Sequence, residues 1–280
     1  MSWLQVSIRA TDVETPHLES LLESLGAVSV TLLDAEDEPV LEPEIGTTPL
    51  WSQTLVVALF PADESIDQLR ERLAATGIDV DRMDLDVLTE RAWEREWMSH
   101  FKPTRFGERL WIVPSWAQAP EPDAINLHLD PGLAFGTGTH PTTALCLTWL
   151  DLQTLKGKTV LDYGCGSGIL AIAALLLGAE EALATDIDPQ ALEATAENAR
   201  QNAVHRIRCL LPEELPTGSV DVLIANILAN PLLLLASDLA SRVVPGGLIA
   251  LSGILCEQAA AVKTAYAEWF TLGEETLDGW

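Results

Sequence analysis

The chain has 280 residues, 48% of them hydrophobic, which is enough for two domains with sizeable cores. It contains no run of eighteen apolar residues and no basic, apolar leader, so we expect a cytoplasmic protein without a membrane span or secretory signal. The four cysteines lie far apart and form no Cys-x-x-Cys pair, which indicates reduced thiols.

The net charge of −26 is unevenly distributed along the chain. Residues 1–90 contain 19 acids and 4 bases, whereas the remaining 190 residues contain 23 acids and 12 bases. An acidic surface repels phosphate backbones, so we expect no direct nucleic-acid binding, and it would attract a basic protein. Taken alone, the charge favours a simpler role in solubility.

The first 88 residues alternate between strand and helix patterns. Strands are predicted over 3–9, 28–33, 55–60 and 80–87. Helices are predicted over 15–25, ending at Gly26, and from a cap at Ser65 or Asp63 to Gly77. The order β-α-β-β-α-β predicts a small ferredoxin-like α+β domain over residues 1–88.

A short charged helix with Trp93, Trp97 and Phe101 at helical spacing is predicted next, and residues 89–102 would form the linker between domains. The aromatic stripe favours packing over ligand binding. A hairpin around Gly107, with Leu110 and Ile112 inward, would open the second domain, residues 103–280.

Residues 129–143 hold three glycines and four threonines and lead into a helix that begins at Pro141 and runs to about Leu150, with His140 or Thr139 before it. Such a loop presents backbone N–H groups and hydroxyls to a ligand, but it lacks the lysine of a phosphate-binding P-loop. A flexible surface loop is the alternative. It is less favoured because it would expose Leu133 and Phe135.

The stretch 158–169 reads as a strand, a glycine turn and the start of a helix. Asp162 ends the strand, and Gly164, Gly166 and Gly168 follow at alternate positions. The dinucleotide fingerprint Gly-x-Gly-x-x-Gly would need glycine at position 169, where Ile169 stands. An acid followed by this glycine spacing is typical of methyltransferases that use S-adenosylmethionine (SAM).

Two aspartates follow the next predicted strand, 182–186. Asp188 precedes Pro189 and suits a helix N-cap, which leaves Asp186 free for a ligand. Asp186 follows Gly168 by 18 residues, near the ~20 expected for an acid that binds ribose.

The remaining chain continues the alternation. We predict a strand over 220–227 with Asn226 near its carboxyl end, a helix over 231–240, a turn and strand over 245–253, a helix over 256–269 and a last strand beginning in 270–280. Strands alternating with helices predict a doubly wound, mainly parallel, Rossmann-like sheet that binds ligands at the carboxyl ends of its strands.

The polar residues at those strand ends suit methyl transfer from SAM. The glycine turn would let the backbone approach the cofactor, and Asp186 would accept hydrogen bonds from both ribose hydroxyls. Thr142 and Thr143 would close over the methionyl end, and Asn226 would offer an oxygen to the amine nucleophile. In-line displacement at a sulfonium requires neither a metal nor a covalent residue, so we predict no metal site.

The glycine turn and Asn226 each allow another interpretation. The glycines could serve a nicotinamide oxidoreductase or an inactive binding module, and Asn226 could cap the following helix and do nothing else. The five histidines have no metal-ligand spacing, His140 is better suited to a loop or cap than to a base, and no Ser-His-Asp arrangement is identifiable.

Four stretches together resemble the PrmA family of bacterial ribosomal protein methyltransferases. They are residues 130–143, residues 162–170, residues 186–189 and residues 225–231. The resemblance covers nearly the whole chain, and the threonine-rich loop and the Asn-Ile-Leu motif are more specific than the glycine turn.

The resemblance implies trimethylation of lysine side chains and of the N-terminal α-amine of large-subunit protein eleven. It also implies an N-terminal domain that recognises the substrate and swings on the linker. The matching cofactor positions are Thr143, Gly164, Asp186 and Asn226, and we add Gly166 to this set and assign catalytic roles to Asn226 and Thr142. We expect a monomer. Family members usually continue past the position of Trp280, so we expect the last strand to be short or missing.

Overall fold

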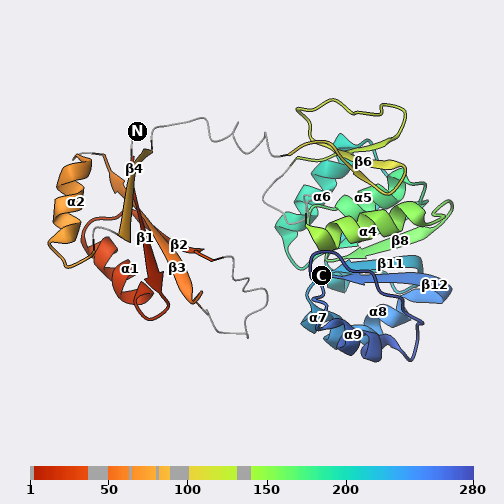
Figure 1. Ribbon diagram of the computed structural model, residues 1–280. Coiled ribbons are helices and arrows are strands. Elements are labelled where there is room, and N and C mark those ends of the chain that lie inside the picture. The colour runs from red at the N-terminus through yellow and green to blue at the C-terminus, as the bar shows by residue number, and fades with distance from the viewer. Residues whose placement is uncertain (1–2, 37–49, 63–64, 80–81, 89–100, 131–139) are drawn as a thin grey trace. The chain divides into compact units, whose positions relative to one another are not determined.

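The structure is a computed structural model that describes residues 3–36, 50–62, 65–79, 82–88, 101–130 and 140–280. The chain divides into two compact units, Met1–Ser99 and His100–Trp280 (Figure 1). The predicted linker helix and most of the glycine–threonine loop fall outside the described residues. The predicted domain limits at 88 and 103 therefore stay a prediction.

The N-terminal unit has the ferredoxin-like arrangement that the sequence predicts. Its elements are β1 (Trp3–Thr11), α1 (Thr15–Ser24), β2 (Ser29–Asp34), β3 (Gln53–Pro61), α2 (Ile66–Ala74) and β4 (Met83–Leu88). The strands form an antiparallel sheet in the order β2-β3-β1-β4. Alternate residues of β1 and β3 are buried against the two helices in one core, as a sheet with one covered face requires.

Ser65 begins α2, as one of the two predicted caps. Its Oγ accepts a hydrogen bond from the Gln68 backbone N–H at 3.2 Å, and Gln68 Oε1 accepts one from the Ser65 N–H at 2.9 Å. This reciprocal pair satisfies two backbone donors that a helix start leaves without partners.

The C-terminal unit is built on a five-stranded, wholly parallel sheet in the order β10-β9-β8-β11-β12. Its strands are β8 (Thr159–Tyr163), β9 (Glu181–Thr185), β10 (Ile207–Leu210), β11 (Val220–Asn226) and β12 (Val243–Ser252). Its helices are α4 (Pro141–Leu152), α5 (Ile169–Leu176), α6 (Pro189–Gln201), α7 (Ala229–Leu234), α8 (Ala236–Ser241) and α9 (Ala259–Tyr266), with a 3₁₀ turn at Pro212–Glu214. The doubly wound prediction is confirmed, because α4, α5 and α6 cover one face and α7, α8 and α9 the other (Figure 1).

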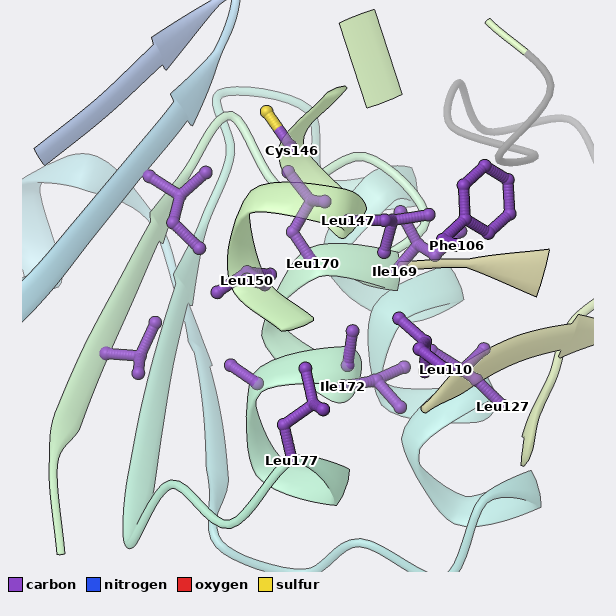
Figure 2. Close-up of a cluster of buried hydrophobic side chains, with 14 of the residues drawn as sticks. Phe106, Leu110, Leu127, Cys146, Leu147, Leu150, Ile169, Leu170, Ile172 and Leu177 are labelled. Atoms are coloured by element: carbon purple, nitrogen blue, oxygen red, sulfur yellow. The ribbon is translucent and has the colours of Figure 1, made fainter. Parts of the chain in front are cut away.

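The middle strands are apolar on both faces because helices cover both. Along β8 and β11, Val160, Val222 and Ile224 face the cluster under α4 and α5, while Leu161 and Leu223 face the cluster under α7–α9. Figure 2 shows the first cluster, where side chains from α4 and α5 meet those of a smaller sheet.

The smaller sheet contains a strand that the sequence analysis missed. β5 (Thr104–Phe106) and β6 (Leu110–Val113) form the predicted hairpin, with Leu110 and Ile112 buried. β7 (Ile125–His128) pairs with β6 in parallel and was not predicted. Asn202, at the end of α6, bonds both the N–H and the C=O of His128 and so fixes this sheet on the unit.

Three predictions near the C-terminus need correction. The single helix over 231–240 is two short helices that meet at Leu235, where the Leu232 carbonyl accepts a hydrogen bond from the buried Tyr266 hydroxyl. The helix over 256–269 is limited to α9. Residues 270–280 form no strand, which corrects the strand predicted to begin there and agrees with the expectation of a short or missing last strand. Their last four residues make a turn in which Leu277 and Trp280 exchange backbone hydrogen bonds.

No helix in the described part of the chain is long and apolar enough to cross a membrane.

Candidate active site

The order of the parallel sheet reverses between β8 and β11, and the carboxyl ends of these strands border the crevice where such sheets bind ligands. We call this place the switch point. The glycine turn follows β8, and Asn226 ends β11. Asp186 follows β9, the next strand. The topology therefore brings the predicted residues to one edge of the sheet.

The glycine turn is shaped so that larger residues do not fit. Gly164 has φ +80°, and a Cβ added there would overlap with Cγ2 of Ile227, the residue after Asn226. Gly168 has φ +77°, and its added Cβ would lie 2.6 Å from Cγ2 of Thr195 in α6. Glycine is required at both positions by backbone conformation and by close packing across the crevice.

Side chains of α6 hold the carbonyl groups of this turn. Thr195 Oγ1 donates to the Gly166 carbonyl at 3.0 Å, and Asn198 Nδ2 donates to the Ser167 carbonyl at 2.8 Å. The shape of the turn is thus set by the protein and is available to a ligand without reorganisation.

Asp186 is tied to the glycine turn through its carboxylate. Oδ2 accepts from the Gly166 N–H at 3.0 Å, and Oδ1 accepts from the Asp188 N–H at 3.0 Å. Each carboxylate oxygen can accept more than one hydrogen bond, so acceptor capacity remains on this half-buried side chain. Asp188 is the predicted N-cap, with Oδ1 accepting from the Gln190 N–H at 2.9 Å.

Asn226 and Thr143 meet across the crevice. Asn226 Nδ2 donates to Thr143 Oγ1 at 3.3 Å, and both Thr142 and Thr143 are buried in the first turn of α4. The Asn226 Oδ1 atom is buried and finds no hydrogen-bond partner among the residues that the structure describes. Leu228 occupies the N-cap position of α7, so the geometry does not support Asn226 as the cap of that helix.

The start of α4 is fixed from two directions. His140 is its N-cap, and its Nδ1 accepts from the Thr142 N–H at 3.3 Å and lies 2.7 Å from Thr142 Oγ1. Ser252 Oγ, at the end of β12, donates to the Thr142 carbonyl at 3.1 Å. Burial lowers the pKa of His140, which favours the neutral ring that this cap needs.

Asp162 was not among the predicted site residues. Its side chain is fully buried, and Oδ2 accepts from the Ala171 N–H of α5 at 3.0 Å. No described residue donates a hydrogen bond to Oδ1. Burial raises its pKa to about 7, with a further contribution from the nearby Asp186 carboxylate. An acid at the end of an apolar strand, just before the glycine turn, was the sequence signal for this residue.

A cavity of about 520 Å³ lies away from these residues, along the outer edge of β12. Trp149 of α4, Lys263 of α9 and Trp280 contribute to its lining, but none of the predicted site residues does. We assign the candidate site to the strand ends, because the polar groups converge there.

Comparison with known proteins decides the family. The model of the family described as "Ribosomal protein L11 methyltransferase (PrmA)" matches residues 2–280. This chain belongs to the ribosomal protein L11 methyltransferase family.

Two relatives and one solved structure show the extent of the similarity. The L11 methyltransferase of Hahella chejuensis is 59% identical over 273 residues, which cover 97% of this chain and 94% of that protein. That of Pseudomonas aeruginosa is 58% identical over an alignment of 284 residues, covering 100% and 97%. A crystal structure of an L11 methylase from Lactobacillus delbrueckii subsp. bulgaricus is 38% identical with a TM-score of 0.55, covering 60% of this chain and 88% of that one.

The chain is a SAM-dependent methyltransferase, and the site fits that cofactor. The glycine turn is held in a fixed positive-φ conformation and Asp186 keeps acceptor capacity. Among the described residues, the buried Asn226 Oδ1 has no hydrogen-bond partner. When bound, SAM supplies a methyl group on a positively charged sulfur.

Proposed function

We propose that this chain trimethylates amino groups, namely lysine side chains and the N-terminal α-amine, of the large-subunit ribosomal protein L11. The single observation that carries this proposal within the site is the Asn226 amide. It is held by Thr143 at the switch point, and within the described part of the chain its buried acceptor has no partner. Because a buried acceptor without a partner is unfavourable, a bound N–H donor at this point would be stabilised.

We assign cofactor binding to Thr143, Gly164, Gly166, Asp186 and Asn226. The Asp186 carboxylate is oriented by the Gly166 and Asp188 N–H groups, so its remaining lone pairs suit the two hydroxyls of a ribose. At Gly164 the absence of a Cβ lets the Ile227 side chain, just after β11, pack against the turn, which brings the ends of β8 and β11 close together. A preformed site of this kind reduces the entropy lost when the reactants are aligned.

We assign catalytic roles to Asn226 and Thr142. The nucleophile in methyl transfer must be a neutral amine, so the protein has to position an N–H group while its lone pair points at the carbon. Asn226 Oδ1 can accept one N–H hydrogen bond and thereby orient the lone pair. Thr142 is buried in the adjacent helix turn, where its carbonyl is held by Ser252 and its hydroxyl lies beside His140.

We further propose that residues 1–88 recognise the substrate, that residues 89–102 link the domains, and that residues 103–280 form the methyltransferase domain. The excess of acids in residues 1–90 supports recognition of a basic ribosomal protein and disfavours direct nucleic-acid binding. We propose a cytoplasmic monomer. Other proteins and small amines are the alternative substrates within the same chemistry, and nucleic acid is the least favoured.

Ligand titration tests the assignment of the cofactor groups. The protein should bind SAM and not NAD, and Asp186→Ala should weaken SAM binding by about tenfold or more, because one side chain would lose hydrogen bonds to two hydroxyls. Equal binding of SAM by the variant and the parent would refute the ribose role. Mass spectrometry of L11 after reaction would then count the methyl groups on each amine.

A further inference from the structure

Residues near the C-terminus contact the start of α4. The indole of Trp280 and the imidazole of His140 pack edge to face, with ring centroids 4.9 Å apart and planes at 71°. This separation and angle lie in the range that aromatic pairs prefer, where the edge of one ring meets the face of the other. The contact joins two positions that are 140 residues apart in the sequence.

The backbone around Trp280 is itself fixed. The Trp280 N–H donates to the Leu277 carbonyl at 3.0 Å, and the Leu277 N–H donates to the Trp280 carbonyl at 2.9 Å. The Cys256 N–H, between β12 and α9, donates to the Gly279 carbonyl at 3.0 Å. The half-buried indole is therefore presented from a closed turn that is anchored to the body of the unit.

His140 connects Trp280 to the active site. Its Nδ1 caps α4 through the Thr142 N–H, and the next residue, Thr143, receives the Asn226 Nδ2 hydrogen bond. A histidine caps a helix only when its ring takes one orientation, with Nδ1 turned towards the N–H groups of the first turn. A ring packed against its side restricts the alternatives.

We propose that Trp280 is a positioning residue for the cofactor site. It holds the His140 ring in the capping orientation, and through that cap it keeps Thr143 aligned with Asn226. The contact that links Trp280 to this site is the one with the His140 ring, so we place its effect there. The backbone hydrogen bonds of residues 277–280 hold the Trp280 ring in place against the first turn of α4.

SAM titration of the full chain tests this proposal and does not depend on the identity of the protein substrate. Trp280→Ala should raise the dissociation constant for SAM by roughly three- to tenfold, the effect expected from losing one edge-to-face contact. Trp280→Phe keeps an aromatic ring and should restore most of the affinity. Trp269→Ala is the matched control, because Trp269 is a 44% exposed tryptophan in the turn after α9.

Repeating the measurement in a His140→Asn variant distinguishes a positioning role of Trp280 from a general loss of stability. Asparagine is a good N-cap without an aromatic ring, so His140→Asn should preserve the start of α4 and remove the contact with Trp280. In that background Trp280→Ala should change SAM affinity by less than about twofold. The proposal is overturned if Trp280→Ala behaves like Trp269→Ala, or if its effect is as large in the His140→Asn background as in the parent.

Discussion

The polar side chains at the switch point differ in how fully the protein uses their hydrogen-bonding capacity. Asp188 is used as a helix cap, and Asp186 accepts two backbone N–H groups and retains lone pairs. Asn226 donates to Thr143, and its acceptor has no partner in the segments that the structure describes. Groups that the fold satisfies hold the site, whereas those it leaves unsatisfied are the ones available to ligands.

The most specific prediction for a single residue concerns Asn226. At saturating SAM, Asn226→Ala should lower kcat by about 10²-fold or more, since it removes the acceptor proposed to orient the amine. Thr143→Val keeps that acceptor and removes only the hydrogen bond from Asn226 Nδ2 to Thr143, so kcat should fall clearly less than in Asn226→Ala. Single-turnover rates would give both values. If Thr143→Val were the more damaging change, the tether and not the acceptor would carry the effect.

Gly164 should tolerate alanine only when its neighbour across the crevice is reduced. Gly164→Ala should abolish measurable SAM binding, because the new Cβ overlaps with Cγ2 of Ile227. Adding Ile227→Ala removes that atom and should recover part of the binding, while the strain of a positive φ remains. Gly157→Ala is the control, since Gly157 has φ +75° and nothing within 4 Å of its added Cβ. Calorimetric titration would compare the three variants, and equal loss in all of them would rule out the steric explanation.

The buried Asp162 predicts a dependence of stability on pH. Its pKa in the folded protein is about 7, against an ordinary value of 3.8, and burial is the main cause. The unfolded chain therefore releases this proton at lower pH than the folded protein does, so stability falls as the pH rises from about 4 to about 7. Asp162→Asn cannot ionise, so between about pH 5 and pH 8 it should gain stability relative to the parent on the order of a few kcal/mol.

Urea unfolding at a series of pH values measures this difference. The amide introduced by Asp162→Asn would still offer an oxygen to the Ala171 N–H, which limits the structural disturbance. A constant difference between parent and variant across the range would show that burial does not raise the pKa of Asp162.

At the scale of elements, Asp151 joins the end of α4 to the β5–β6 turn. Its buried carboxylate accepts from the Glu108 N–H at 2.6 Å, from the Arg109 N–H at 3.3 Å and from Arg109 Nε at 3.2 Å. Asp151→Ala should therefore destabilise the unit by about 2–4 kcal/mol, because several donors lose one acceptor. Leu152→Ala, at the adjacent and 64% exposed position, should cost less than about 0.5 kcal/mol. Chemical denaturation of the two variants would test this contrast.

The elements that sequence could predict are those with local chemical signals. Ser65 and Asp188 identify helix starts because a short polar side chain must accept the free N–H groups there. The glycine turn and Asp186 follow from backbone and ligand chemistry that is encoded in a few consecutive residues. Two strands were missed, β7 and β10. Asn126 and Arg208 do alternate with apolar residues, but each strand is only four residues long, too short for that alternation to stand out from the flanking loops.

Other features depend on partners that are distant in the sequence. The break at Leu235 follows the Leu232 carbonyl, which accepts a hydrogen bond from Tyr266. In place of a last strand, the chain ends in a turn whose Gly279 carbonyl accepts from the Cys256 N–H. The tether between Asn226 and Thr143 joins positions 83 residues apart, and the unpartnered state of Asn226 Oδ1 can be seen only in the fold. The sequence predicts that these residues lie on one edge of the sheet, but only the fold shows which of their atoms can still form hydrogen bonds with a ligand.

At the scale of the whole molecule, the acidic charge predicts a salt-dependent encounter with a basic protein. With L11 as substrate, kcat/KM should fall severalfold when ionic strength is raised from about 0.05 M to about 0.3 M, while kcat stays nearly constant. Steady-state kinetics at several salt concentrations would show this. An unchanged kcat/KM would mean that the charge serves solubility and not recognition.

We propose that this fold transfers methyl groups from SAM to amino groups of L11. The most direct measurement is transfer of tritium from methyl-labelled SAM to free L11, to large subunits that lack methylation and to ribosomal RNA, with the parent and Asn226→Ala in parallel. We predict label on L11 with the parent enzyme, little with the variant and none on RNA. Label on RNA would contradict L11 as the substrate, and equal labelling of L11 by both enzymes would contradict the catalytic role of Asn226.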